Sequence, residues 1–193
     1  LECEVDTGAC PSGRIQRLIN AAKATIEGIE IETKISLTDQ FSLEGSLGYT
    51  DAGFDEFLGF DADGVRGYDP ITDPVAAAAL KFERVPELTY NIMANYFQPL
   101  ANGAELDFRI SYSYTDDFYN NALMTEAIKT DSYGLLDASV SYTSAQSGLK
   151  LTVFGKNITD EDYHDFALDN ALTSLTWGGV PDTYGLRLTY SFD

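Results

Sequence analysis

Apolar and polar residues alternate along seven segments of this chain, and this period of two limits the possible folds more than any other feature. In a β-strand, alternate side chains point to opposite faces, so each segment is expected to have one apolar and one polar face. Near the C-terminus, for example, Tyr184, Leu186 and Leu188 alternate with Gly185 and Arg187. The predicted strands lie near residues 29–37, 41–49, 88–96, 106–114, 136–142, 149–153 and 184–192.

The predicted connections alternate between short and long. Short ones lie near residues 38–40, 98–104 and 144–148, and long ones cover residues 51–87, 116–132 and 158–182. Short turns at one end and long loops at the other are typical of outer-membrane barrels. Aromatic residues lie at the strand ends, as expected for interfacial girdles: Phe41, Tyr49, Tyr96, Tyr112, Tyr114, Tyr142, Tyr184 and Phe192. We predict an all-β fold of antiparallel transmembrane barrel strands, with short periplasmic turns and long extracellular loops.

Composition excludes two other classes of protein. The 193 residues include 12 Lys and Arg against 31 Asp and Glu, which gives a formal charge of −19. A chain this acidic repels phosphate backbones, so we expect no nucleic-acid partner. The longest apolar run covers only residues 75–80, whereas a transmembrane helix needs roughly 20 apolar residues.

A few local features interrupt the alternation. Asp73 and Pro74 before an alanine run predict a short helix over residues 73–80, and residues 12–22 have helical spacing. Gly28 lies where the apolar parity shifts, so a bulge is expected there. The two cysteines, Cys3 and Cys10, are too few for a disulfide framework and lack the spacing of a zinc site. Their spacing does allow a single disulfide bond between them. Because the chain begins with leucine, we expect either a processed chain or a piece of a longer protein.

Three segments carry more specific patterns. Residues 20–32 precede residues 41–52, residues 154–163 read Phe-Gly-Lys-Asn-Ile-Thr-Asp-Glu-Asp-Tyr, and Trp177, Gly178 and Pro181 precede the strand that ends near Phe192. In spacing and order, these segments resemble the C-terminal strands of TonB-dependent outer-membrane receptors. The central motif is the most specific of the three. One departure is that such receptors usually end on the aromatic residue, whereas here Asp193 follows it.

The resemblance implies a fold, a location and partners. Residues 23–193 would be the C-terminal part of the receptor barrel, about the last seven of 22 strands, and residues 1–22 would be an extracellular loop segment. The partners would be the remaining barrel strands, a plug domain, TonB acting through that plug, outer-membrane lipid and a small-molecule substrate. The protein would be a transporter in a Gram-negative outer membrane, without enzymatic activity or cofactor, for a siderophore, cobalamin or carbohydrate.

The orientation also follows from this resemblance and from the strand count. We expect Asp193 and the turn at residues 144–148 to face the periplasm, and Cys3 and Cys10 to lie in an extracellular loop.

The motif near residue 160 has both a functional and a structural interpretation. Asn157, Asp160 and Tyr163 could contact a substrate, but Asn and Asp often close turns by bonding local backbone, and we favour that structural role. His164, the single histidine, lies between acidic residues, and we expect an ordinary solvated side chain rather than a metal ligand.

Acidic residues elsewhere in the sequence do not indicate a catalytic or metal-binding site. Glu30 and Glu32 share the polar face of one strand, which in a large barrel faces the lumen, so we expect no glycosidase pair. Four acidic residues are arranged somewhat like a calcium-binding loop, but the glutamate that closes such a loop is absent. These residues are Asp61, Asp63, Asp69 and Asp73. The sequence therefore assigns no catalytic, cofactor-binding or metal-ligating residue, and the substrate-binding residues are unknown.

The long connection over residues 51–87 is the strongest candidate for substrate contact, because loops of this length often carry function. It mixes acidic residues with aromatic ones: Phe54, Phe57, Phe60, Tyr68 and Phe82. A packed lid without ligand contact is the alternative for this loop.

Two other classes of protein show similar alternation. A soluble β-barrel or sandwich that binds an apolar ligand would turn its apolar faces inward, but it would not explain the aromatic strand ends or the loop asymmetry. A small outer-membrane barrel with a structural or adhesin role is opposed by the odd strand count.

Overall fold

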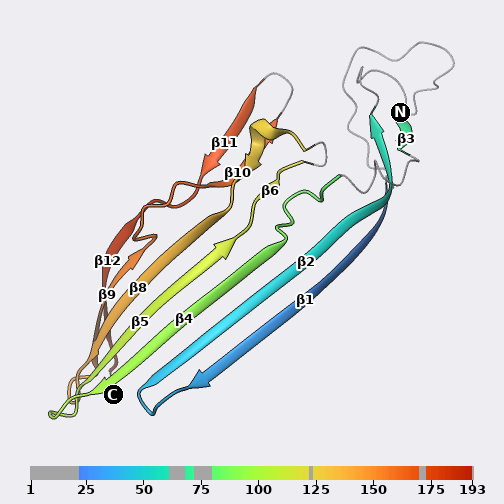
Figure 1. The fold of residues 1–193 in the computed structure, drawn as a ribbon. Coiled ribbons are helices and arrows are strands. Elements are labelled where there is room, and N and C mark those ends of the chain that lie inside the picture. The colour runs from blue at the N-terminus through green and yellow to red at the C-terminus, as the bar shows by residue number, and fades with distance from the viewer. Residues whose placement is uncertain (1–21, 61–67, 72–79, 122–123, 170–172, 193) are drawn as a thin grey trace.

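The computed structural model describes residues 22–60, 68–71, 80–121, 124–169 and 173–192. Seven long strands form one antiparallel sheet in which neighbours in the chain are neighbours in space (Figure 1). They are β1 (Ala22–Ser36), β2 (Phe41–Phe60), β4 (Leu88–Pro99), β5 (Glu105–Thr115), β8 (Tyr133–Thr143), β9 (Leu149–Lys156) and β12 (Thr183–Tyr190). All seven predicted strands and the antiparallel all-β fold are confirmed.

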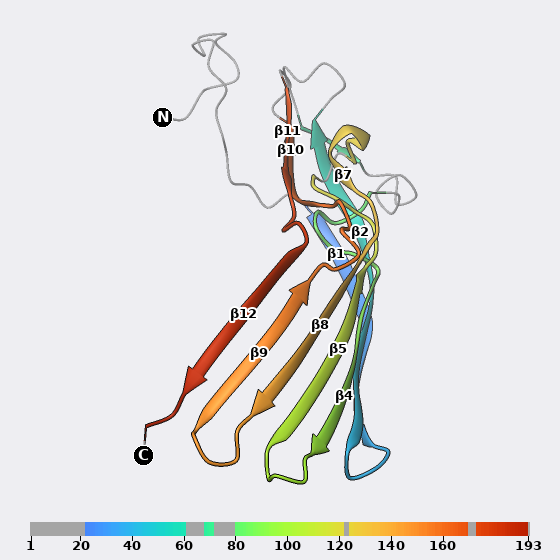
Figure 2. The ribbon, with the colours of Figure 1, turned by 90° about the vertical axis from the view of Figure 1, so that its left-hand side faces the viewer.

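Short turns and long connections lie at opposite ends of the sheet, as predicted (Figure 2). In the turn between β1 and β2, the Thr38 hydroxyl accepts hydrogen bonds from the backbone N–H groups of Gln40 and Phe41 at 3.2 and 2.9 Å. In the turn between β8 and β9, Gly148 has a φ of 59°, and a Cβ there would lie 2.6 Å from the Ser191 carbonyl oxygen. Local hydrogen bonds and one glycine therefore close these turns tightly.

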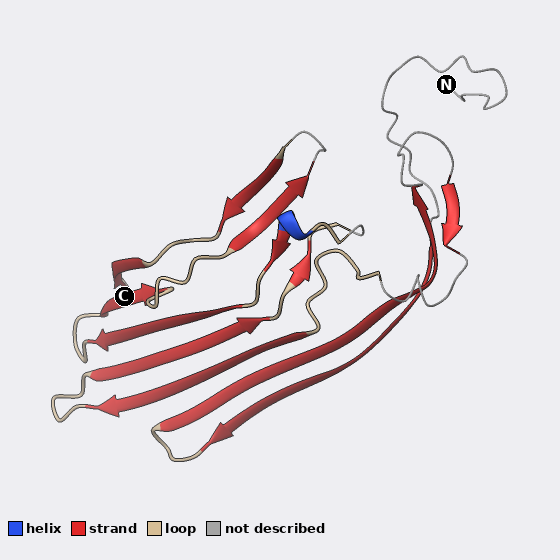
Figure 3. Ribbon diagram, turned by 45° about the horizontal axis from the view of Figure 1, so that its top comes forward, coloured by secondary structure: helices blue, strands red, loops and turns tan. Residues whose placement is uncertain are grey.

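The long connections contain short elements of their own (Figure 3). These are β3 (Tyr68–Ile71), β6 (Phe118–Tyr119), the 3-10 turn η1 (Glu126–Ile128), β7 (Lys129–Thr130), β10 (His164–Asp169) and β11 (Ser174–Gly178). The prediction that the loop begins at residue 51 is wrong, because β2 continues to Phe60. Its extension pairs first with β1 and then with β3, so backbone hydrogen bonding carries the strand past the end of the alternation.

The predicted bulge at Gly28 is also wrong. The register between β1 and β2 shifts between Lys23 and Ala24 and is unbroken from there to Ser36. Gly28 serves close packing instead, because a Cβ at this position would lie 2.6 Å from the Tyr49 carbonyl oxygen.

The predicted helices over residues 12–22 and 73–80 lie outside the described residues, apart from Ala22, which begins β1, and Leu80. Within the described residues, no helix is long and apolar enough to cross a membrane.

Strand register places the alternating apolar residues on a single face, named the outward face here. One row across six strands contains Leu186, Val153, Val140, Phe108, Tyr96 and Phe41. Nothing in the described part of the chain covers this face, and the Leu186 and Leu188 side chains are 67% and 64% exposed. No charged residue occupies its positions over residues 29–35, 41–49, 88–98, 106–114, 134–142, 149–155 and 184–190.

Aromatic residues mark the limits of the aliphatic band on this face. In β12, Tyr184 and Tyr190 lie on either side of Leu186 and Leu188. In β2, Phe41 and Tyr49 occupy the ends of the alternating segment, and β4 repeats the arrangement, whereas the outward positions of β1 and β9 carry no aromatic residue. An uncharged band between two rows of aromatic residues is the outer surface that a membrane barrel presents.

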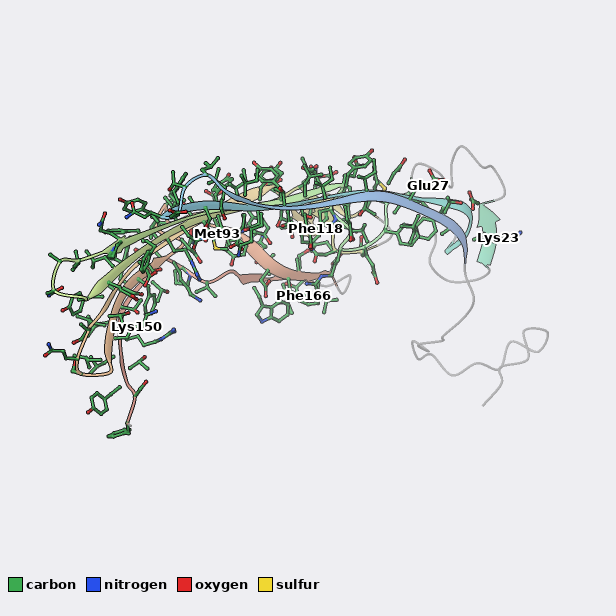
Figure 4. All side chains as sticks on the ribbon, turned by 90° about the horizontal axis from the view of Figure 1, so that it is seen from below. Lys23, Glu27, Met93, Phe118, Lys150 and Phe166 are labelled. Atoms are coloured by element: carbon green, nitrogen blue, oxygen red, sulfur yellow. The ribbon has the colours of Figure 1, made fainter. Side chains whose placement is uncertain are left out.

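The sheet has two free edges. β1 pairs only with β2, and β12 pairs only with β9, among the described strands. Seen from below, the sheet curves as an arc, with the side chains of Met93 and Lys150 on its hollow side (Figure 4). An arc with open edges and an exposed apolar outer face leaves backbone hydrogen-bonding groups and apolar side chains that no described residue covers.

Candidate functional site

The polar face lines the hollow side of the arc and is the first part of the candidate site. Its side chains bond to one another along the strand rows. The Arg109 Nε donates to the Asn95 Oδ1 at 2.9 Å, the Ser141 and Thr152 hydroxyls lie 2.8 Å apart, and other pairs include Lys34 with Glu44 at 2.7 Å. This network makes a hydrophilic wall that can border water or a polar protein surface.

Cationic side chains gather where β5, β9 and β12 form this wall. Arg109, Lys150 and Arg187 line one depression near the short-turn end, and Lys156 lines its continuation. The Arg187 guanidinium lies 5.7 Å from the ring centre of Phe154, which is also on the polar face. Because Phe97 also belongs to this wall, the face that is expected to be polar carries two aromatic rings as well.

The long connections pack together at the other end of the sheet. Phe118, Ile128, Thr130 and Ala167 are buried there, and they come from β6, η1, β7 and β10. The Asn120 side chain donates to the Ile128 carbonyl at 2.8 Å and to the Thr130 hydroxyl at 2.9 Å. These connections are therefore an ordered cap rather than independent loops.

Ion pairs and hydrogen bonds on the surface of the cap stabilise it further. Lys129 lies 2.8 Å from an Asp117 carboxylate oxygen, and the hydrogen bond between them raises the pKa of the Lys129 ammonium. The Tyr119 hydroxyl donates to Glu126 at 2.6 Å, which raises the pKa of Tyr119.

One surface of the cap is apolar and exposed. Cross-strand pairs of the β10–β11 hairpin place Phe166 beside Trp177 and Leu168 beside Leu175, while Ala167 on the opposite side is buried. The Phe166 and Trp177 rings lie 5.2 Å apart, and the Trp177 side chain is 49% exposed. The residues Phe166, Leu168, Leu175 and Trp177 are called the hairpin face below.

Arg84 adds a positive charge at the edge of the hairpin face. Its guanidinium lies 5.2 Å from the Phe166 ring centre and donates to the Asp165 carbonyl at 3.3 Å. Its backbone N–H donates to the Tyr119 carbonyl at 2.8 Å, so Arg84 ties three connections together. An anionic ligand with a planar group could stack on the exposed Trp177 ring and pair with this cation.

The motif residue Asn157 is structural. Its side chain is 3% exposed and makes three hydrogen bonds, from the Glu161 N–H at 2.9 Å and to the carbonyls of Glu161 and Val180 at 2.9 and 3.1 Å. Its own N–H donates to the Asp137 carboxylate at 2.9 Å. The predicted role of closing a turn onto local backbone is confirmed for Asn157, with Val180 as an additional, distant partner.

The other motif residues surround this turn. Asp160 has a φ of 53°, and its N–H donates to the Asn157 carbonyl at 2.9 Å. The Tyr163 ring stacks on Tyr133 at 4.4 Å, and its hydroxyl accepts a hydrogen bond from the Val180 N–H at 3.3 Å. His164 is exposed at the start of β10 and is not brought together with Asn157.

The remaining candidates form no chemical site in the described part of the chain. Glu30 and Glu32 share the polar face of β1 as predicted. No group of three or more His, Cys, Asp or Glu residues is placed to hold a metal ion among the described residues. Cys3, Cys10 and most of the calcium-like acidic segment lie outside those residues.

The aromatic residues of the predicted loop over residues 51–87 bear on whether that loop contacts a substrate or is a packed lid. The Phe54 ring on β2 and the Phe82 ring of the connection to β4 stack at 4.2 Å with an angle of 7° between their planes, so part of this connection packs against β2. The hairpin face and Arg84 were not predicted. A short alternation in residues 165–169 was the available signal, but nothing local to Arg84 indicates that it reaches Phe166.

Solved structures of similar shape are siderophore receptors. The ferric yersiniabactin uptake receptor FyuA from Yersinia pestis matches with a TM-score of 0.69 and 18% identity, over 90% of this chain and 24% of that one. The siderophore receptor PiuA from Acinetobacter baumannii matches with a TM-score of 0.68 and 16% identity, over 88% of this chain and 22% of that one.

A third similar structure is the ferric-catecholate import receptor Fiu from E. coli K12, with a TM-score of 0.60 and 19% identity, over 86% of this chain and 20% of that one. The chain thus spans between a fifth and a quarter of the length of these receptors. At these identities, the similarity establishes the fold.

The family model for TonB dependent receptor-like β-barrels matches residues 4–158. Members of this family are transporters and receptors of the Gram-negative outer membrane rather than enzymes. The match covers most of the chain and includes the strands from β1 to β9, whose polar wall and uncharged outer face are described above. The chain therefore belongs to the TonB-dependent receptor β-barrel family.

Proposed function

We propose that residues 23–193 form about the last seven strands of a 22-stranded barrel in the outer membrane, and that residues 1–22 are an extracellular segment. The uncharged outward face contacts lipid, and the polar face lines the lumen. The short turns face the periplasm and the cap faces the exterior. Strands absent from this chain pair with the edges of β1 and β12, because unpaired N–H and C=O groups in hydrocarbon cost several kcal/mol each.

The whole receptor imports a scarce nutrient, with energy supplied by TonB through a plug domain that these 193 residues do not include. A ferric siderophore is favoured over cobalamin or a carbohydrate. The hairpin face supports this choice, because the exposed Trp177 ring and the half-buried Phe166 ring beside Arg84 suit an anionic chelate that carries planar aromatic groups. Among the similar structures, FyuA is a receptor for ferric yersiniabactin, PiuA is a receptor for a siderophore, and Fiu is a receptor for ferric catecholate.

Uptake by intact cells tests this function. A strain that lacks the receptor should fail to accumulate iron from at least one radiolabelled ferric siderophore, and the whole receptor gene should restore accumulation. Restoration should require TonB. If accumulation is unchanged for every siderophore but falls for cobalamin or a carbohydrate, the proposed substrate class is wrong.

Removing the exposed indole should weaken this uptake. For Trp177→Ala, we expect about a three- to tenfold loss of apparent affinity, since an aromatic contact is worth about 0.5–1.5 kcal/mol. Trp177→Phe keeps a ring and should retain most of the affinity. Leu37→Ala removes an apolar side chain that is also exposed, but at the short-turn end, and should change nothing. Equal uptake by Trp177→Ala and the parent receptor would exclude the hairpin face from the binding surface.

A further inference from the structure

Charge is separated along the polar wall. The polar face of β1 and β2 carries Glu30, Glu32 and Glu44 with a single lysine, Lys34, which is paired with Glu44 at 2.7 Å. At the other side of the arc, β9 and β12 carry Lys150, Lys156 and Arg187 and contain no acidic residue at all. In a chain with a formal charge of −19, two adjacent strands without a single carboxylate stand out.

The cations on β9 and β12 have no ionic partner within the described part of the chain. No carboxylate oxygen lies within ion-pair distance of Lys150, Lys156 or Arg187, although Arg187 lies over the Phe154 ring. Asp39, Glu44 and Asp107 line the same depression, and Asp137 lines its continuation, but none of these carboxylates forms an ion pair with the three cations. All three side chains are exposed on the hollow side, where a filling domain would contact them.

Lys150 shows where the missing carboxylate must come from. Its neighbours in the strand row are Thr143 on β8 and Thr189 on β12, so neither adjacent strand offers it an acidic partner. Arg187 is on the edge strand and could pair sideways with a strand absent from this chain. Lys150 has an ordered strand on each side, so only a group that projects into the hollow can reach it.

We propose that the plug domain presents an acidic surface to β9 and β12, with carboxylates that pair with Lys150 and Arg187. This inference rests on the proposed function, since it requires a closed barrel with a plug. An acidic plug surface fits the position, because the depression lies at the short-turn end, inside the wall and far from the cap. Burial between plug and wall would strengthen such pairs relative to exposed ones.

The test compares glutamine variants of the whole receptor. A fluorophore on the plug reports its release from the barrel during a urea titration. For the double variant Lys150→Gln with Arg187→Gln, we expect the urea midpoint of plug release to fall by about 0.5–1 M. The difference from the parent receptor should shrink when sodium chloride is raised, because salt screens ionic attraction.

Lys34→Gln is the matched control, because Lys34 lies on the same face but already has its partner in the wall. It should leave the midpoint unchanged. The proposal is overturned if the double variant behaves like Lys34→Gln, or if Arg187→Gln alone has the whole effect, which would place its partner on the neighbouring strand. Lower siderophore affinity with an unchanged midpoint would assign the cations to an anionic ligand instead and would also overturn it.

Failure of the proposed function itself would be visible before the glutamine variants are compared. A receptor without a closed barrel would lack the heat-dependent shift in gel migration that folded outer-membrane barrels show, before any variant is compared.

Discussion

Replacing Leu188 by arginine is expected to destabilise the barrel by about 2–4 kcal/mol. Leu188 lies on the outward face between Tyr184 and Tyr190 and is 64% exposed, and in the proposed barrel this face contacts lipid. A guanidinium in this uncharged band must leave water without finding a partner. Equilibrium unfolding of the whole receptor in lipid vesicles, with guanidinium chloride as denaturant, measures the loss of stability.

Thr189→Arg is the matched control for this substitution. It introduces the same side chain one residue later, where the strand faces the hollow and already has Arg187 and Lys150 nearby. We expect a change well below that of Leu188→Arg. Equal destabilisation by the two variants would contradict the assignment of faces in β12.

Replacing Asn157 by glycine is expected to cost about 2–4 kcal/mol. Glycine tolerates the φ of 47° at this position, so the loss isolates the side chain. The change removes three hydrogen bonds in a buried environment and leaves the Glu161 N–H and the Val180 carbonyl without this partner. The unfolding midpoint and the rate of hydrogen exchange at the Glu161 amide both report the effect.

Asp160→Gly provides the comparison for Asn157→Gly. Asp160 also has a positive φ, but its exposed carboxylate makes no hydrogen bond with any residue that the structure describes. We expect a change within about 0.5 kcal/mol, of either sign. If both glycine variants lose the same stability, the backbone conformation rather than the Asn157 amide holds this turn.

The strands were predictable because their faces meet different surroundings. A short run such as Leu186, Arg187 and Leu188 already shows which residues share the apolar face and which share the polar face, since slipping a strand by one residue would exchange the two sets. The positions of the short turns followed from the same pattern, as Gly148 and Thr38 interrupt it at the expected places.

The cap was not predictable in the same way. The β10–β11 hairpin is stabilised by packing between connections, with Ala167 buried in the cap and Arg84 bonded to Asp165 from a position 81 residues earlier. Apart from the short alternation in residues 165–169, such contacts leave no periodic trace in the sequence. The extension of β2 to Phe60 likewise depends on pairing with β1 and β3 rather than on a continued apolar alternation.

The candidate site also has features that the sequence predicted and features that required the fold. The structural role of Asn157 followed from the residue type, but its bond to Val180, 23 residues later, required the fold. The unpaired state of Lys150 became visible only with the strand register, which places threonines on both sides of it.

Contact with lipid at every second residue of β12 is the feature that distinguishes a barrel wall from a soluble sheet. Spin labels at positions 184–190 of the whole receptor, reconstituted in lipid vesicles, measure collisions with oxygen, which concentrates in the bilayer, and with a water-soluble nickel complex. We expect high oxygen accessibility at Leu186 and Leu188 and low oxygen accessibility at Arg187 and Thr189. A profile without a period of two, or one with the two faces exchanged, would contradict the placement of this chain in the wall of an outer-membrane barrel.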